Sequence, residues 1–398
     1  MIKQLIDICP CTAYYIVKTK GRDNMKKIIA LALSAVMVAS FSGCGSSESS
    51  KGKETSAESA TEAQETQATQ ETFAADLKAR LDEALKTKSF SGVVQITKGG
   101  EPVYQYVSGN DENGKPLTID ASLPLASTSK QFCAAAIMLL CEQNKLSVDD
   151  TLDRYFPEYK EGKKITVKQL LTMSSGIPSY YMDFLDPSTL GSNEAENVRK
   201  IKEAVFAMEL HFEPGEDYEY SNSNFFLLAD IVEQLGRVSY HEFLRKSFFE
   251  PLGMTHTGFL EEIPDDPDWA AAMSKTELLN ETTAPGLAKG AGDIVSNAED
   301  MDKWMRGLSG GEIISSESFR QMRENINPYS VEDYCYGLWH MPYDGVGHVG
   351  QIAPHFGAVD YLNPERDVYL FAASNDGRGM SYVQELPQTL LSIIYDNK

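Results

Sequence analysis

The sequence predicts an α+β fold, in which helices flank an antiparallel sheet and a helical insertion separates the strands. Strand-like segments occur near the start of the folded part, in SGVVQITKGG and EPVYQYVSG at 91–109, and again near its end, at 335–374. A polar stretch rich in helical patterns lies between them, and one more helix closes the chain. This order predicts one sheet that is built from both ends of the domain.

Each element of this domain has its own signal in the sequence. A helix is expected at 74–88, and the two strands after it meet at Gly99 and Gly100, which predicts a hairpin. The run QFCAAAIMLLCEQNK, which starts at Gln131, is apolar on all sides, as a helix buried along its length should be. Late strands are expected in CYGLWHMPY, HVGQIAPHFGAVDYLNP and RDVYLFAAS, before a closing helix at 383–396.

The residues before this domain carry the pattern of a secretory signal. From Met25, basic residues, an apolar stretch and small residues precede Cys44. The run FSGC resembles a bacterial lipobox, although Phe41 replaces the usual leucine, so Cys44 is the expected lipidation site. An ordinary signal peptide with an incidental cysteine is the alternative. We expect an upstream extension at 1–24 from a mis-assigned start, a lipoprotein signal peptide at 25–43, and an extracytoplasmic protein anchored to the cell membrane.

The segment 44–72 is rich in Ser, Thr, Glu, Gln and Ala and contains no large apolar residue. Because such a composition cannot offset the entropy of ordering, we expect a disordered tether here and a folded domain at 73–398. The whole chain has 36 basic and 58 acidic residues, a net charge of −22. No basic block interrupts this acidity, so nucleic acid is not an expected partner.

The cysteines indicate neither a disulfide scaffold nor a metal site. Cys133 and Cys141 lie on one predicted helix, about 12 Å apart along its axis, which is beyond the reach of a disulfide. Cys335 could pair only through a long-range contact, which the sequence does not reveal. Neither the cysteines nor the histidines have zinc-ligand spacing, so no metal is expected.

Ser127 and Lys130 stand three residues apart just before the apolar helix, in ASTSKQF. On a helix, this spacing places the two side chains on one face, about 5 to 6 Å apart at Cβ. Serine becomes a nucleophile when a base takes its proton, and a buried lysine with a lowered pKa can be that base. The same S-x-x-K spacing occurs at Ser50 in the tether. The alternative is that Ser127 caps the helix while Lys130 reaches solvent.

Six blocks follow one another along the chain: ASTSKQF, NKLSVDDTLDRYFPE, ITVKQLLTMSSGIP, FEPGEDYEYSNSNFFLLADIVEQL, FFEPLGMTHTGF and KGAGDIVSNAEDMDKW. In this order they resemble serine hydrolases related to class C β-lactamases and low-molecular-mass penicillin-binding proteins, including D-alanyl-D-alanine carboxypeptidases. The resemblance runs from residue 75 to the C-terminus. It implies a β-lactamase-like fold and hydrolysis of an amide or ester bond through a covalent acyl-enzyme on Ser127. The implied substrate is a small peptide, an ester or a β-lactam, without a cofactor.

The resemblance also implies a second motif, Tyr-x-Asn, which matches Tyr220-Ser221-Asn222 on the loop before a predicted helix. In the family, Tyr220 would share the proton transfer with Lys130, and Asn222 would orient the substrate amide or hold Lys130. A phenol titrates near pH 10, so Tyr220 would need Lys130 beside it to act as a base. The alternative is a turn that carries a packed aromatic ring.

A third motif, Lys/His-x-Gly, matches both His256-Thr257-Gly258 and His348-Val349-Gly350. We assign it to His348, which stands before a predicted strand hairpin, whereas His256 follows a block with its own place in the family. The glycine, Gly350, would let substrate lie close to the strand, and the backbone N–H groups of Ser127 and Gln351 would form the oxyanion hole. His348 would polarise Tyr220 or, if protonated, bind a substrate carboxylate, but imidazole in place of ammonium puts carboxylate-dependent substrates in doubt.

Two other interpretations compete with this one. GLSGG at 307–311 fits the G-x-S-x-G pattern with Ser309 at its centre, but a helix precedes it where a strand is needed, so a turn is expected. A non-catalytic cell-surface lipoprotein could bind cell-wall peptide through the same cleft. Departures from the family pattern are Met173, where histidine is common, and Pro354-His355-Phe356, which puts a bulky ring where glycine is common.

Overall fold

The computed structural model describes residues 74–111, 113–180, 189–262, 284–324, 326–330, 333–352, 356–375, 378 and 380–396. The chain divides into two compact units, Met1–Asp76 and Leu77–Lys398, and the fold described below is that of the second unit. The predicted extension, signal peptide and tether, and Cys44 with them, lie outside the described residues. Their boundaries stay predictions.

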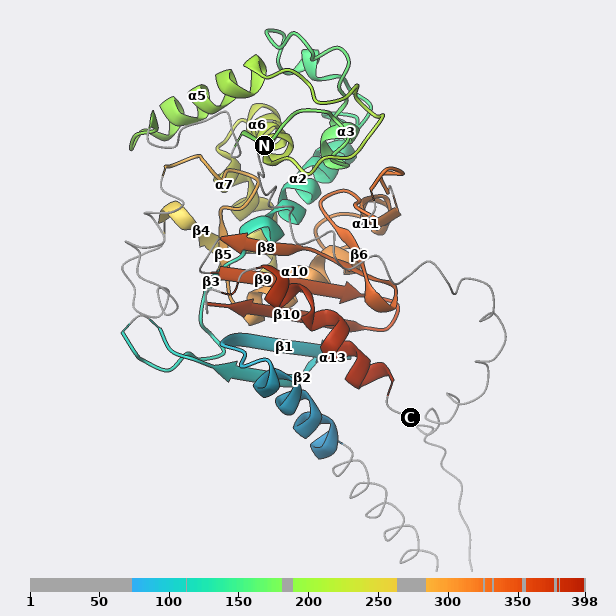
Figure 1. Ribbon diagram of the computed structural model, residues 1–398. Coiled ribbons are helices and arrows are strands. Elements are labelled where there is room, and N and C mark those ends of the chain that lie inside the picture. Colours follow the sequence, from blue (N-terminus) through green and yellow to red (C-terminus); the bar gives the residue numbers. More distant parts are fainter. Residues whose placement is uncertain are drawn as a thin grey trace, which may run out of the picture. The chain divides into compact units, whose positions relative to one another are not determined.

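The main sheet of the described part is antiparallel throughout and contains seven strands. Its order is β2 (Glu101–Ser108), β1 (Gly92–Lys98), β10 (Val368–Ser374), β9 (Phe356–Asn363), β7 (Gly345–Gly347) and β6 (Trp339–Met341), with β8 (Val349–Ile352) also paired to β9. The N-terminal strand β1 therefore pairs with the late strand β10, as Figure 1 shows. The predicted sheet, built from both ends of the domain, is confirmed.

The central strands are buried on both faces because their side chains alternate between two cores. Val93 and Phe371 point into one core and Val94 and Leu370 into the other. Helical residues 77–87 and α13 (Leu386–Tyr395) supply the second core. The first core includes α2 and α10. The predicted hairpin is present, since Gly99 and Gly100 have positive φ angles of 62° and 81° between β1 and β2.

The remaining elements lie mainly between β2 and β6 in the chain, as the predicted helical insertion requires. The helices are α2 (Lys130–Glu142), α3 (Val167–Leu171), α5 (Glu194–Ala207), α6 (Asn222–Gly236), α7 (Tyr240–Leu244), α8 (Glu250–Leu252), α10 (Ala298–Gly310), α11 (Ser316–Glu324) and α12 (Met380–Gln384). A small sheet has the order β3 (Leu123–Pro124), β5 (Ile294–Ser296) and β4 (Gly258–Phe259). In Figure 1, α2, α3, α5, α6 and α7 lie on the β8 side of the main sheet.

Helix α2 is the apolar helix that the sequence predicts. Its side chains are buried on all sides from Lys130 to Met138, and Phe132 stacks on Trp304 of α10 with ring centroids 3.7 Å apart. The helix continues directly from a 3₁₀ turn, η2 (Ala126–Ser129), which carries Ser127. The core therefore holds the start of α2 rigidly, and this is where the candidate nucleophile lies.

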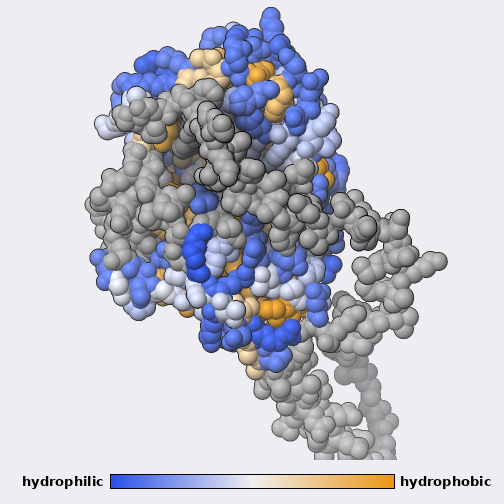
Figure 2. Space-filling model, in the orientation of Figure 1, coloured by the Kyte–Doolittle hydropathy of each residue, from blue (hydrophilic) through white to orange (hydrophobic). Residues whose placement is uncertain are grey.

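Figure 2 shows a mostly hydrophilic face with small, separate hydrophobic areas among the coloured residues. Within the described ranges, no helix combines the length and the apolar character needed to cross a lipid bilayer.

Candidate active site

Ser127 lies in a tight turn between β3 and α2. Its neighbour Ala126 has φ 48°, a left-handed conformation that is unfavourable for any residue with a Cβ. Such strain costs about 1 to 3 kcal/mol, and the packing around the turn has to offset it. The turn is held by Leu125, whose backbone N–H donates to the carbonyl of Ile294 in β5. The strained turn thus fixes where the Ser127 hydroxyl points.

Lys130 is fully buried at the first turn of α2, and its amine reaches the serine. The Lys130 Nζ atom lies 3.0 Å from Ser127 Oγ and donates to the carbonyl of Ala291 at 2.6 Å. Burial lowers the pKa of the Lys130 ammonium to about 7, although the charges of Cys133 and Asp293 act in the opposite direction. A large fraction of Lys130 is therefore neutral at neutral pH, as a base requires. The alternative in which Lys130 extends into solvent is wrong.

Tyr220 is the third member of this group. The Lys130 Nζ atom lies 5.0 Å from the centroid of the Tyr220 ring. Around that ring, Trp339 stacks at 5.8 Å and Tyr334 packs edge-on at 6.1 Å. The structure thus brings together the three predicted catalytic side chains, which are supplied by η2, α2 and the loop before α6.

Met173 holds the loop that carries Tyr220. Its sulfur accepts from the backbone N–H of Ser221 at 3.4 Å, and its carbonyl accepts from the N–H of Glu219 at 3.1 Å. Met173 is fully buried and has φ 57°, so its backbone turns sharply towards this loop. The residue where the family often has histidine therefore positions Tyr220 through both its sulfur and its backbone.

Asn222 begins α6 and donates its backbone N–H to Ser179 Oγ at 3.3 Å. Within the described residues, the hydrogen-bond acceptors of the Lys130 amine are Ser127 and Ala291, so Asn222 does not hold Lys130 in this structure. Its second predicted role, orientation of the substrate amide, stays a prediction.

His348 lies beside Tyr220, as the assignment of the third motif predicts, but it is fully buried. Its ring centroid is 4.2 Å from that of Trp339 and 6.4 Å from that of Tyr220. Burial and the nearby Lys130 hold the pKa of the imidazole well below its ordinary value. His348 is therefore neutral, and the protonated form considered from the sequence is not the one that this environment favours.

Gly350 allows β8 to pass directly over the Ser127 turn. A Cβ atom on Gly350 would lie 2.2 Å from the carbonyl oxygen of Leu125 and 2.8 Å from the backbone nitrogen of Ser127. The close approach that requires glycine is thus made by the protein's own backbone, a contact that the sequence-based argument, which considered only substrate, did not include. The next residue on β8 is Gln351, which pairs with Gly357 of β9.

Replacement of Gly350 by alanine is expected to lower kcat/KM by about 100-fold, because the added Cβ would collide with backbone atoms of Leu125, Ser127 and Thr128 and the Ser127 turn must shift. Hydrolysis of an aryl ester measures the loss, and a thermal melt checks the fold. Gly191→Ala is the matched control, since no atom lies within 4 Å of its added Cβ. Wild-type kinetics for the Gly350 variant would show that the contact has no importance for the site.

Asp360 is a buried group near the site that the sequence analysis missed. Its carboxyl accepts from the backbone N–H of His348 and from Gln131 Nε2, both at 2.8 Å. The Gln131 side chain also accepts from the indole N–H of Trp304 at 2.7 Å. Burial raises the pKa of the Asp360 carboxyl to about 7, against the effect of these hydrogen bonds. One acidic residue inside the apolar strand FGAVDYL is the signal that could have revealed it.

Comparison with known proteins identifies the family. The beta-lactamase family model matches residues 77–393. The chain belongs to the beta-lactamase family. Predicted membership of this family, an α+β fold and serine hydrolase activity are all confirmed. The comparisons give no support to the non-catalytic alternative.

Among curated members of the beta-lactamase family, the chain is 28% identical over 309 residues to "Putative penicillin-binding protein PbpX" of Bacillus subtilis (strain 168). That match covers 75% of this chain and 74% of PbpX. It is 26% identical over 288 residues to protein flp of Staphylococcus aureus (strain MRSA252), covering 69% of this chain and 56% of flp. The chain thus spans little more than half the length of flp.

Solved structures of the family include a D-amino acid amidase from Ochrobactrum anthropi SV3 in complex with L-phenylalanine amide. It superposes with a TM-score of 0.68 at 25% identity, covering 81% of this chain and 99% of the amidase. An octameric penicillin-binding protein homologue from Pyrococcus abyssi gives a TM-score of 0.65 at 25% identity, covering 81% of this chain and 77% of the homologue.

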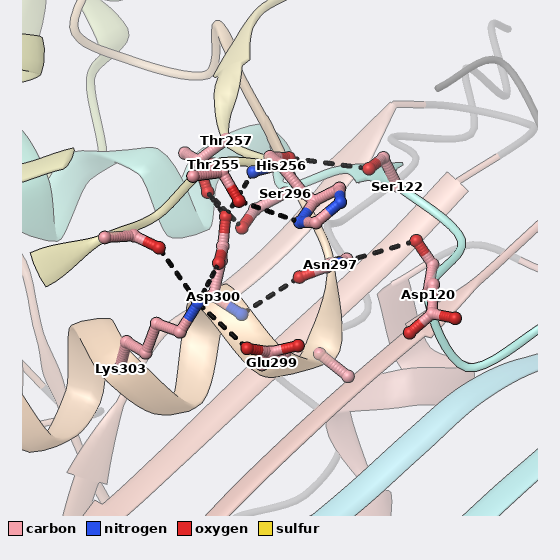
Figure 3. A network of polar contacts seen from close by, with 12 residues as sticks. Asp120, Ser122, Thr255, His256, Thr257, Ser296, Asn297, Glu299, Asp300 and Lys303 are labelled. Carbon is pink, nitrogen blue, oxygen red and sulfur yellow. Dashed lines mark hydrogen bonds and ion pairs between the residues drawn. The ribbon is translucent and has the colours of Figure 1, made fainter. Parts of the chain in front are cut away.

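The competing match to the third family motif, at His256, lies in a different polar network, drawn in Figure 3. Asp300, in the first turn of α10, accepts from the His256 backbone N–H at 2.7 Å and from the Thr257 hydroxyl at 3.0 Å. Lys303 pairs with the other oxygen of Asp300 at 3.0 Å. Through these hydrogen bonds, the segment that leads into β4 contacts α10, whereas His348 lies among the rings around Tyr220.

The sequence also led to expectations for Ser309, for the cysteines and for residues 354 and 355. Ser309 was expected in a turn, and that is wrong, because it lies in α10 and donates to the carbonyl of Met305 at 2.8 Å. The helix continues to Gly310, and Gly311, which has a left-handed backbone, caps its end. Cys133, Cys141 and Cys335 are free thiols. Residues 354 and 355, considered as a rim of the site, lie outside the described residues.

Proposed function

We propose that Ser127 is the nucleophile of this serine hydrolase and that Lys130 is the base that activates it. The observation that carries the proposal is the 3.0 Å contact between Ser127 Oγ and a fully buried lysine amine. The lowered pKa of Lys130 supports it, because a neutral amine can accept the serine proton at neutral pH. Transfer of that proton to Nζ leaves the oxygen free to attack a carbonyl carbon.

Attack by Ser127 Oγ forms a tetrahedral intermediate whose oxyanion accepts from the backbone N–H groups of Ser127 and Gln351. The passage of β8 over the Ser127 turn supports this placement, and each such donor contributes a few kcal/mol. The leaving group takes a proton delivered through Lys130 and Tyr220, whose ring centroid lies 5.0 Å from the Lys130 Nζ atom. The C–N or C–O bond then breaks, an ester remains on Ser127, and water hydrolyses it.

The substrate in this proposal is a small amide, peptide or ester. The D-amino acid amidase and the penicillin-binding protein homologue among the structural relatives support the amide class. Carboxypeptidase activity on cell-wall peptides is a narrower form of the same proposal.

Covalent labelling tests the proposed nucleophile. A fluorophosphonate should add one phosphonyl group to the purified wild-type protein, and mass mapping should place it on Ser127. The Ser127→Ala variant should stay unlabelled while it melts at the wild-type temperature. Labelling at another residue, or none in the folded wild type, would contradict the proposal.

We also propose that the protein is held at the outer face of the cell membrane through a lipidated Cys44, with 45–72 as the tether. The basic and apolar segment before Cys44 supports this proposal. Cys44→Ala should move the protein from the membrane fraction to the culture medium. Equal distribution of the wild type and the variant would contradict it.

A further inference from the structure

We infer that the enzyme prefers esters and amides whose leaving group carries no carboxylate. The inference rests on the proposed function of the same site and narrows its substrate class. It starts from His348, which precedes β8, the strand that passes over the Ser127 turn. In the family that the sequence resembles, a cation at the position of His348 would bind a substrate carboxylate.

Both ring nitrogens of His348 already have partners in the protein. Nδ1 lies 2.8 Å from the carbonyl oxygen of Val349, and since a carbonyl can only accept, Nδ1 carries the proton. Nε2 lies 3.5 Å from the hydroxyl of Tyr334, which is placed to donate to it. A neutral imidazole with its one proton on Nδ1 satisfies both contacts, because Nε2 then accepts from the Tyr334 hydroxyl.

The packing leaves His348 no access to a bound anion. It is fully buried, and the rings of Trp339 and Tyr334 lie against it with centroids 4.2 Å and 5.9 Å away. A positive charge on the His348 ring would be desolvated, and the charge of the nearby Lys130 amine would repel it. A substrate carboxylate therefore meets a neutral, covered ring where the family motif would otherwise supply a cation.

The two buried lysines of the described part hold protein partners: Lys130 has Ser127 and Ala291, and Lys289 pairs with Glu233 at 2.8 Å. The surface field acts in the same direction, since a net charge of −22 repels anions that approach the molecule.

Arg378 is also committed, at a distance from Ser127. Its guanidinium donates to the carbonyls of Lys88 and Ser89, which precede β1. Gln351 and Gly92 lie on one register line across β8, β9, β10 and β1. Three strand spacings, about 14 Å, separate these two residues, so the carbonyls that Arg378 binds precede a strand that is distant from β8.

The test compares two esters that differ only in one carboxylate, phenyl acetate and 3-carboxyphenyl acetate. The meta carboxylate changes the reactivity of the ester little. Dividing each kcat/KM by the rate of uncatalysed hydrolysis of the same ester corrects for the remaining difference in reactivity. We expect kcat/KM of the wild-type enzyme for the neutral ester to exceed that for the anionic one. The ratio should stay constant from about pH 6 to about pH 8, because titration of Lys130 affects both substrates equally.

A variant makes the comparison specific to His348. His348→Gln keeps a neutral side chain, so it should leave the ratio between the two esters within about twofold, whatever its effect on the absolute rates. If His348 were a cation that binds carboxylate, the variant would selectively lose the anionic ester.

The outcomes separate the two proposals. An equal or higher kcat/KM for the anionic ester, or its selective loss in His348→Gln, overturns the inference and leaves the hydrolase intact. Turnover of neither ester above the Ser127→Ala background overturns the proposed function on which the inference rests.

Discussion

Replacement of Ser127 by alanine is expected to lower kcat at least about a thousand-fold, because no other atom can form the acyl-enzyme. The fold should be unaffected, since the change removes one hydroxyl from a turn that is held by backbone contacts. The activity that remains reflects binding and the oxyanion hole alone. Steady-state hydrolysis of phenyl acetate, corrected for the uncatalysed rate, measures the loss.

Ser309 is the matched control for this experiment. It lies at the centre of the other serine pattern, GLSGG, but its hydroxyl donates to Met305 within α10. Ser309→Ala should keep kcat and KM within about twofold of the wild type. The assignment fails if Ser309→Ala abolishes turnover, or if Ser127→Ala keeps more than a tenth of it.

Replacement of Lys130 by methionine is expected to lower kcat as much as Ser127→Ala does and to raise the stability of the folded protein. Without the amine, the Ser127 proton has no acceptor, so kcat should fall by about 10³-fold or more, and the double variant should be no worse than either single one. That lack of additivity is the sign of two groups that act as a unit. Acylation rates of the two single variants and the double variant measure it.

The stability effect follows from the pKa of Lys130. Its value falls from 10.5 in the unfolded chain to about 7 in the folded protein, so between these values the unfolded state binds more protons and stability rises with pH. Below pH 10 the buried lysine therefore lowers stability. Methionine removes this cost but leaves the Ala291 carbonyl without its partner, so at neutral pH we expect a net gain of about 1 to 3 kcal/mol.

Urea unfolding of the wild type and Lys130→Met at several pH values checks this prediction. The wild type should gain stability from about pH 7 towards pH 10, whereas the variant should lack this part of the pH dependence. In the wild-type enzyme, kcat/KM should rise with pH through about 7 as the amine becomes neutral. A stability loss in Lys130→Met, with the wild-type pH dependence kept, would show that the lysine is not buried as a costly cation.

Much of the fold was predictable because its signals are local. The Gly-Gly hairpin, the apolar helix after Lys130 and the late strands each depend on residues that lie within one element. The helix through Ser309 was missed for the same reason, since glycines in GLSGG favour a turn locally. Packing of Trp304, Met305 and Leu308 in the core keeps α10 helical to Gly310.

The residues of the site could be predicted from local spacing and from the order of the family blocks, but their contacts with distant parts of the chain could not. The proximity of Ser127 and Lys130 follows from three residues of spacing, and the order of the family blocks pointed to Tyr220 and His348. Nothing local indicated that Ala291 would accept from Lys130, or that Asp360 would bond to both Gln131 and the His348 backbone. The contacts of Lys130 with Ala291 and of Gln131 with Asp360 join residues 161 and 229 positions apart. The contact of His348 with Asp360 joins residues 12 positions apart.

The sequence by itself determined the sheet built from both ends, the serine and lysine on one turn, and the family to which the chain belongs. Only the tertiary structure decided the charge of the two basic groups, a lysine with a pKa of about 7 and a neutral histidine. The physical reason is that spacing along the chain is a local property. The protonation state of a side chain depends on how much water and which charges remain around it after the whole chain has packed.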